Sequence, residues 1–211
     1  MRTSTGSGNI PDVTERSQPF SFYEQDTILV AKNLLGCVLV HLDGDHTTAG
    51  RIVETEAYLR TDPAAHSFHG KTRSNSVLFG PAGHAHVFFV YGMYWCMNVV
   101  TGREGSEGAV LLRALEPLEG IPVMQERRRT RDIRLLCSGP GRLTRALAIT
   151  GEFNGVPLTS GSLRIRPPDR TATPGPEGEG EIVQTTRVGI SKAQEMPYRF
   201  YLKGNANVSR K

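Results

Sequence analysis

The chain has 211 residues, of which 38% are hydrophobic and 22% are charged, the size and composition of one soluble domain. No run of about 18 apolar residues occurs, which excludes a membrane-spanning helix, and the first residues show no apolar signal segment, so we expect a cytoplasmic protein without a membrane partner. The formal net charge of +4 favours an acidic partner, such as a nucleic acid, without requiring one.

Local signals define the first elements along the chain. Residues 1–19 are rich in Ser, Thr, Gly and Pro, which predicts a mobile tail ahead of one domain over residues 20–211. Apolar residues at helical spacing predict a helix over residues 27–35, and a strand is predicted over residues 37–42. Asp43-Gly44-Asp45 then predicts a hairpin turn, because Asp-Gly is a favoured pair in tight turns.

The same signals extend through the rest of the chain. Further strands are predicted over residues 47–59, 84–100, 109–115 and 199–203, and further helices over residues 119–129 and 142–149. Residues 151–181 are rich in Pro and in alternating Gly and Glu, which predicts a loop-rich excursion. This order of elements indicates an α+β fold, with a mainly antiparallel, curved β-sheet flanked by helices and a protruding β-hairpin.

The cysteines and histidines give no pattern typical of metal ligands. Cys37, Cys96 and Cys137 are odd in number and widely spaced, which favours buried, reduced thiols over a disulfide framework or a zinc cluster. His84 and His86 share a strand face, but no third ligand has a convincing spacing. We therefore predict no metal site and no cofactor.

Two carboxylates lie on one face of the predicted strand 47–59. A period of two places Ile52, Glu54, Glu56 and Tyr58 on the same side of that strand. Exposed glutamates are common on strands, so this segment alone is equally consistent with a solvated outer face.

Arg113 interrupts an otherwise apolar run, residues 108–115, which is expected to be buried. A buried guanidinium needs an anionic partner, because an unpaired buried charge costs several kcal/mol. Glu54, Glu56 and Glu116 are the candidate partners. A purely structural ion pair is an equally good interpretation of this arginine.

Aromatic residues crowd around a glycine that is predicted to form a hairpin bend. Of the chain's fifteen aromatic residues, five lie within eight positions: Phe88, Phe89, Tyr91, Tyr94 and Trp95. Core packing explains most such clusters, but bulky groups at a bend would face water. A tip of this kind suits insertion between stacked bases.

The five arginines between residues 127 and 134 are more typical of a solvated face than of a phosphate contact.

Several of these segments, read together, carry a resemblance to a known family. The motifs are RIVETEAY (51–58), AAHS (64–67), YGMYWCMN (91–98) and LLRALEPLEG (111–120), followed by LCSGP (136–140), RVG (187–189) and RFY (199–201). They resemble the alkyladenine (3-methyladenine) DNA glycosylase family. The resemblance covers nearly everything after residue 20 except residues 151–181.

The resemblance implies a monofunctional hydrolase that flips a damaged purine out of double-stranded DNA and cleaves its N-glycosidic bond. Glu56 would be the general base that activates water, and Arg113 and the main-chain carbonyl of Val188 would help to hold that water. Glu54 would not share this role. The implied protein is a monomer, associated with the nucleoid, whose partner is DNA containing damaged purines.

The resemblance also implies a base pocket. Tyr58, His66 and Phe88 would sandwich the flipped base, with Ala65 in the same pocket. Asn98 would lie where a guanine amino group would clash, which favours adenine-derived lesions. From its sequence context alone, this amide either ties down backbone or reads a ligand edge.

Further residues are implied to contact the DNA itself. Tyr91 would fill the gap that the base leaves, beside Gly92 and Met93 in the minor groove, and Lys71, Arg73 and Arg142 would also contact DNA. The chain departs from the family at two places. Phe88 stands where some members carry Tyr, which removes a hydroxyl contact, and His86 stands where members can carry another aromatic.

Two alternatives belong to other classes of protein. The first is a basic module that stacks single-stranded nucleic acid without chemistry, although a carboxylate on a phosphate-binding face would repel its ligand. The second is a hydrolase that uses Glu54 and Glu56 as an acid and base pair on a free glycoside. It would have no use for the aromatic tip.

Overall fold

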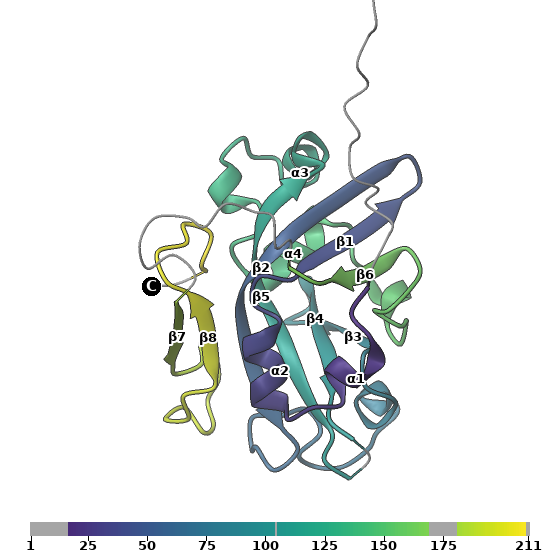
Figure 1. The fold of residues 1–211 in the computed structure, drawn as a ribbon, viewed down its shortest axis with the longest axis vertical. Helices are drawn as coiled ribbons and strands as arrows, with labels where there is room; N and C mark the ends of the chain where they lie inside the picture. The colour runs from purple at the N-terminus through teal and green to yellow at the C-terminus, as the bar shows by residue number, and fades with distance from the viewer. Residues whose placement is uncertain (1–16, 104, 169–180, 210–211) are drawn as a thin grey trace, which may run out of the picture.

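The computed structural model describes residues 17–103, 105–168 and 181–209 (Figure 1). Most of the predicted tail, residues 1–16, and residues 169–180 of the predicted excursion lie outside this part of the chain. The strands are β1 (Val38–Asp43), β2 (His46–Leu59), β3 (Ala85–Val90), β4 (Tyr94–Thr101), β5 (Gly108–Glu119), β6 (Leu163–Arg166), β7 (Ile182–Thr185) and β8 (Arg199–Leu202). The α-helices are α1 (Phe20–Tyr23), α2 (Thr27–Asn33), α3 (Ile121–Arg128) and α4 (Pro140–Ala146), and the 3-10 turns are η1 (Ser76–Phe79), η2 (Ile133–Leu135) and η3 (Gly151–Phe153).

Strand β2 is the centre of the sheet. The described strands form one sheet with the order β3-β4-β5-β2-β1-β6, and all their pairings are antiparallel. On its other edge, β2 pairs first with β1 and then with β8, to which β7 is added. The α+β fold with a mainly antiparallel, curled sheet is therefore confirmed.

The pairing between β2 and β5 is irregular where β2 changes partners. The register shifts on either side of Glu54, so Val53 on β2 and Arg113 on β5 have no partner across this pair. Extra residues of this kind bend a strand and re-aim its side chains. The irregularity brings Arg113 against both Glu54 and Glu56.

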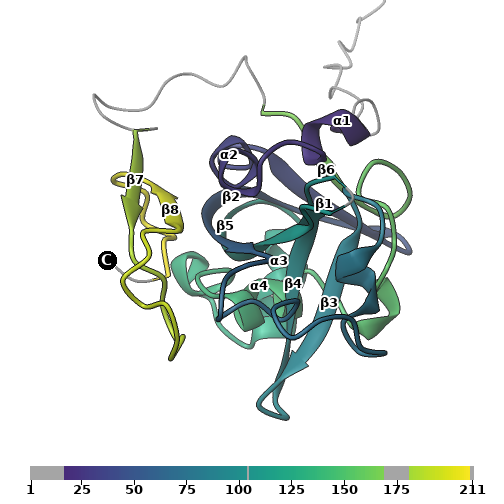
Figure 2. The same ribbon diagram turned by 90° about the horizontal axis from the view of Figure 1, so that it is seen from below.

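Helices cover both sides of the curled sheet. Figures 1 and 2 place α1 and α2 on one side and α3 and α4 toward the other. Asp26 caps α2, because its carboxylate accepts the backbone N–H groups of Ile28 and Leu29 at 2.9 and 3.1 Å. Helix α4 is attached to β4 by Thr144, whose hydroxyl donates to the carbonyl of Trp95 at 2.8 Å. The core lies between these layers.

Strands β3 and β4 form the protruding hairpin that the sequence predicts, and Figure 2 shows it extending away from the other strands. Both central residues of its turn have positive φ, 53° at Tyr91 and 65° at Gly92, and Met93 N donates to Val90 O at 3.0 Å. This is the pattern of a type I′ turn. Glycine adopts it freely, whereas the tyrosine adopts it at a cost.

Two short strands differ from the sequence-based expectation. The described part of residues 151–181 contains η3 and β6, and β6 pairs with β1 instead of belonging to a loop. Leu163 and Ile165 are buried there, but four residues are too few to stand out among prolines and glycines. Strand β7, which among the described strands pairs with β8 alone, is absent from the prediction for the same reason.

Two simpler expectations are also answered by the structure. Cys37, Cys96 and Cys137 are free and buried, and burial raises the pKa of the Cys96 thiol to about 11 and that of Cys137 to about 12. Within the described ranges, no helix is both long enough and apolar enough to span a bilayer.

Candidate active site

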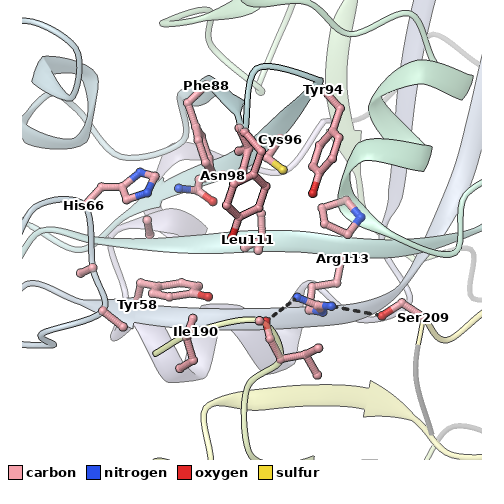
Figure 3. A pocket seen from close by; sticks show the side chains of 18 of the residues that line it. Tyr58, His66, Phe88, Tyr94, Cys96, Asn98, Leu111, Arg113, Ile190 and Ser209 are labelled. Atoms are coloured by element: carbon pink, nitrogen blue, oxygen red, sulfur yellow. Dashed lines mark hydrogen bonds between the residues drawn. The ribbon is translucent and has the colours of Figure 1, made fainter. Parts of the chain in front are cut away.

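A pocket of about 600 Å³ opens between the β3–β4 hairpin, the loop after β2 and the segment after β7. This volume suits one small organic group. Figure 3 shows Tyr58 and Phe88 on opposite sides of the pocket, with His66 at one end and Arg113 at the other. Nine residues that the sequence analysis assigned to the site line this pocket: Tyr58, Ala65, His66, Phe88, Tyr91, Asn98, Arg113, Arg142 and Val188.

Glu54 and Glu56 are completely buried next to this pocket, so the interpretation of their strand face as a solvated surface is wrong. The Arg113 Nε donates to Glu54 Oε1 at 2.9 Å, and its Nη1 lies 3.2 Å from Glu56 Oε1. The third candidate partner, Glu116, pairs instead with Arg51. The two carboxylates of β2 are therefore joined by one guanidinium from β5.

Glu54 is saturated by further donors. Arg199 Nε donates to its Oε1 at 2.7 Å, and Ser209 donates twice, from its backbone N at 2.6 Å and from its hydroxyl at 2.9 Å. Burial lowers the pKa of Arg113, but the nearby Glu56 and Glu54 outweigh that effect and raise it. The two carboxylates thus face two guanidinium groups, and this balance of opposite charges offsets the cost of burying them. We call Glu54, Glu56, Arg113 and Arg199 the carboxylate–arginine centre.

Glu56 is held by donors that themselves line the pocket. The backbone N–H of Val188 donates to Oε1 at 2.7 Å, and the Tyr58 hydroxyl donates to Oε2 at 2.8 Å. Arg113 Nη1 also lies 3.4 Å from the carbonyl oxygen of Val188. Each carboxylate oxygen has two lone pairs, so Glu56 retains capacity for one more donor.

Tyr58 is fixed from behind by Arg187, a residue to which the sequence analysis gave no role. The Arg187 guanidinium lies 4.6 Å from the Tyr58 ring centroid, is buried, and pairs with Asp62. Burial first, and then Glu56, raise the pKa of the Tyr58 hydroxyl, which therefore keeps its proton and donates. An isolated arginine in a polar segment gives no sequence signal of such burial.

The opposite wall is a cluster of rings. His66 meets Phe88 edge to face with centroids 4.6 Å apart, and His86 stacks behind Phe88 at 5.1 Å. Burial lowers the pKa of His66. Asn98 is buried, and its Nδ2 lies 3.3 Å from Nδ1 of His86. Asn98 and Leu111 are opposite each other on β4 and β5, and we call these two residues the pocket floor.

The predicted DNA contacts other than Tyr91 and Arg142 do not line the pocket. Tyr91 and Met93 at the hairpin turn are 75% and 72% exposed, and Gly92 between them is exposed as well. Lys71 and Arg73 are exposed on the loop after β2 and do not line the pocket. The tip and this loop are therefore free to touch a partner that covers the pocket mouth.

A second hollow lies beside the hairpin and is lined by Met93, Arg128, Arg142 and Arg145. Burial first, and then Arg142 and Arg145, lower the pKa of Arg128, so the positive charges of the three guanidinium groups repel one another. None of the described residues that line this hollow carries a carboxylate. This arginine hollow suits an anion, and Arg145 was not identified from the sequence because its helix offers no pattern that distinguishes it.

The described residues contain no group of three or more His, Cys, Asp or Glu side chains that could hold a metal ion. Among the histidines considered as ligands, His84 points its Nδ1 at the carbonyls of Pro81 and Ala82, at 3.1 and 3.3 Å. The Nδ1 of His86 is engaged by the side-chain amide of Asn98 at 3.3 Å.

Comparison with known proteins identifies the family. A family model described as methylpurine-DNA glycosylase matches residues 21–206. The chain is 58% identical over 193 residues to a Methanoculleus marisnigri protein named "Putative 3-methyladenine DNA glycosylase", covering 92% of this chain and 98% of the relative. Proteins of the same name from Carboxydothermus hydrogenoformans and Nitrosospira multiformis are 50% and 44% identical over 194 residues, covering 92% of this chain and 98% and 94% of those relatives. The chain therefore belongs to the methylpurine-DNA glycosylase family, a family of DNA N-glycosylases that act in base excision repair.

Proposed function

We propose that this protein receives a damaged purine, flipped out of duplex DNA, in the 600 Å³ pocket and hydrolyses its N-glycosidic bond with a water activated by Glu56. The substrates are alkylated or deaminated purines of the 3-methyladenine, 7-methylguanine, ethenoadenine and hypoxanthine type. The observation that carries the proposal is a completely buried carboxylate held directly behind an aromatic-walled pocket.

Base flipping explains both the pocket and its selectivity. A glycosidic bond inside a stacked duplex is out of reach, so the nucleotide must be extruded at a cost of a few kcal/mol, which is smallest for damaged bases. Tyr58, Phe88 and His66 then stack on the base. Alkylation at a ring nitrogen makes the purine cationic, and a cation against aromatic faces gains about 0.5–2 kcal/mol.

The chemistry requires one proton acceptor. Glu56 takes a proton from water as the water oxygen bonds to C1′ of the sugar, while the bond from C1′ to the base breaks and its electron pair leaves with the base. The proposed water position lies beside Arg113 Nη1 and the carbonyl oxygen of Val188, two atoms that are 3.4 Å apart. A cationic purine departs as a neutral base and needs no acid, whereas a neutral purine such as hypoxanthine or ethenoadenine takes up a proton from water as it departs. Neither case needs a lysine nucleophile.

Glu54 takes no part in this proton transfer. Its carboxylate is already occupied by Arg113, Arg199 and Ser209. This occupancy argues against an acid and base pair of Glu54 and Glu56 acting on a free glycoside, because the proposed acid has no access to a leaving group.

The exposed features beside the pocket mouth form the DNA-binding face. Tyr91 at the tip is in position to replace the extruded base, with Met93 beside it in the minor groove. The arginine hollow neutralises backbone phosphates, as do Lys71 and Arg73 on the loop after β2. One chain carries all of these parts, which supports action as a monomer.

A panel of duplex oligonucleotides, each with one modified purine, tests the function. Single-turnover excision is followed by alkaline cleavage at the abasic product, with an undamaged duplex of the same sequence as the control. We expect excision of several members of the panel and none from the control. Failure to release any alkylated or deaminated purine would contradict the proposal.

A further inference from the structure

His86 is a buried imidazole that the proposed function does not use. Its exposure is 1%, its ring stacks on Phe88 at an interplanar angle of 15°, and its edge meets His66 with centroids 6.1 Å apart. A phenyl ring could fill this space as well. The polar atoms of a buried imidazole need partners, so those partners indicate what the histidine contributes.

The two ring nitrogens of His86 have different partners. Nδ1 lies 3.3 Å from Asn98 Nδ2, and an amide NH₂ can only donate, so Nδ1 accepts. A backbone hydrogen bond with Ser74 acts to raise the pKa of His86, which requires an accepting carbonyl. Since Nδ1 is already an acceptor, the ring proton that reaches Ser74 lies on Nε2.

The ring is neutral at physiological pH. Burial first, and then the neighbouring His66, lower the pKa of His86 to about 4. Neutral His86 therefore keeps its lone pair on Nδ1, and this lone pair fixes the Asn98 amide in one of its two orientations.

The fixed amide gives the pocket floor a defined polarity. Figure 3 shows the Asn98 amide nitrogen turned toward the His66 side of the pocket and its oxygen turned away from that side. With Nδ2 committed to His86, Asn98 offers the incoming base an oxygen, which accepts hydrogen bonds and cannot donate them.

We propose that His86 is a specificity-determining residue that holds Asn98 with its amide oxygen inward, so that the site prefers damaged purines with an N–H donor on the Watson–Crick edge. This inference deepens the proposed function and rests on it, because flipped bases are read on that edge. Hypoxanthine presents its N1–H there, and it lacks the guanine amino group that is expected to clash with Asn98. Ethenoadenine presents no donor on this edge.

The amide orientation can be tested without any catalysis. Long-range ¹H–¹⁵N spectra of the free, ¹⁵N-labelled protein report which imidazole nitrogen of each histidine carries the proton. We expect the Nε2–H tautomer for His86. An Nδ1–H tautomer would overturn the inference, because Asn98 would then have to present its oxygen to His86 and its NH₂ to the pocket.

The specificity is tested by His86→Phe, which keeps a ring against Phe88 and removes the acceptor. The measurement is the ratio of single-turnover excision rates for hypoxanthine and ethenoadenine in the same duplex. We expect the preference for hypoxanthine to fall about 3- to 10-fold, the equivalent of one hydrogen bond. A packing defect would slow both substrates equally and leave the ratio unchanged, and an unchanged ratio would overturn the inference.

Two controls isolate the route through Asn98. His84→Phe makes the same substitution two residues earlier, outside the pocket lining, and should leave the ratio at its wild-type value. On an Asn98→Ala background, His86→Phe should change the ratio no further, because the amide that it orients is gone. If the wild-type protein releases no damaged purine at all, the proposed function fails. If it releases other damaged purines but neither of these two, the specificity inference fails while the proposed function stands, and the tautomer measurement still decides the orientation of Asn98.

Discussion

The carboxylate–arginine centre and the hairpin tip differ in how firmly the fold holds their side chains. In the centre, Glu54 and Glu56 are completely buried and each accepts three or more donors at 2.6–3.2 Å. At the tip, Tyr91 is 75% exposed and its backbone adopts a left-handed conformation that tyrosine disfavours. The side chains of the centre are held by many hydrogen bonds, whereas the tip is exposed and its backbone is strained.

This difference corresponds to two physical tasks. A proton acceptor must be held within a fraction of an ångström of its water, so many donors converge on it. A group that enters a partner must be free in the unbound protein, and such a group gains its contacts only on binding. Backbone strain at Tyr91 therefore motivates the hypothesis that this residue acts in binding, whereas the centre acts in chemistry.

The largest effect is expected in the centre, for Glu56→Gln. The substitution keeps the size of the side chain and removes its ability to accept a proton, so single-turnover excision of a modified adenine should fall about 10²- to 10⁴-fold. The loss becomes larger if the carboxylate also stabilises positive charge on the sugar. DNA binding should survive, and a variant with near-normal excision would show that Glu56 is not the base.

Glu54→Gln should affect the free energy of unfolding more than the chemistry. The amide would leave the Arg113 and Arg199 guanidinium groups with one carboxylate between them, and breaking a buried ion pair typically costs about 3–5 kcal/mol. Urea unfolding measures this. Glu116→Gln is the matched control, because its pair with Arg51 is about one-third exposed and should cost about 1 kcal/mol or less.

The two glutamates together make the comparison sharp. Per folded molecule, Glu54→Gln should retain far more excision activity than Glu56→Gln. A greater loss of excision at Glu54 would place the general base two residues earlier in β2, and a Glu54 variant as stable as wild type would show that the ion network does not support the fold.

The sequence predicted the parts of the fold that have long periodic patterns. The alternation over residues 47–59 and the aromatic hairpin around Gly92 were both recognisable, because many residues contribute to each pattern. Strands β6 and β7, with four residues each, owe their existence to pairing with β1 and β8. Such tertiary pairing has no local signal.

The site was predictable where one residue conflicts with its surroundings. Arg113 in an apolar strand indicates a buried anionic partner, but both bonded glutamates depend on a register shift that no periodicity reveals. Arg187 and Ser209 reach the site from segments without regular structure, next to the last strands. Their positions follow from the three-dimensional fold alone.

The hairpin tip should show a smaller effect, in binding and flipping. Tyr91→Ala removes the ring that we propose replaces the extruded base, and the loss of stacking should weaken binding to a lesion-containing duplex by about 1–3 kcal/mol. The fold should be unaffected, since the side chain is largely exposed. If the variant binds and excises lesions from duplex DNA as well as wild type, Tyr91 is only a surface aromatic and the contrast between tip and centre loses its functional meaning.

The smallest effect is expected at the arginine hollow, and it should be independent of the lesion. Arg145 is exposed and lines the hollow beside Arg142, so Arg145→Ala should weaken binding to damaged and undamaged duplexes alike and lower the slope of log K against log salt by about 1. Lys203→Ala removes the same charge from β8's end, where Lys203 pairs with Glu181, and serves as the control. Because both variants change the net charge equally, a slope that falls only for Arg145→Ala identifies a phosphate contact, whereas equal slopes in the two variants would assign the effect to overall charge and leave the hollow without a role in DNA binding.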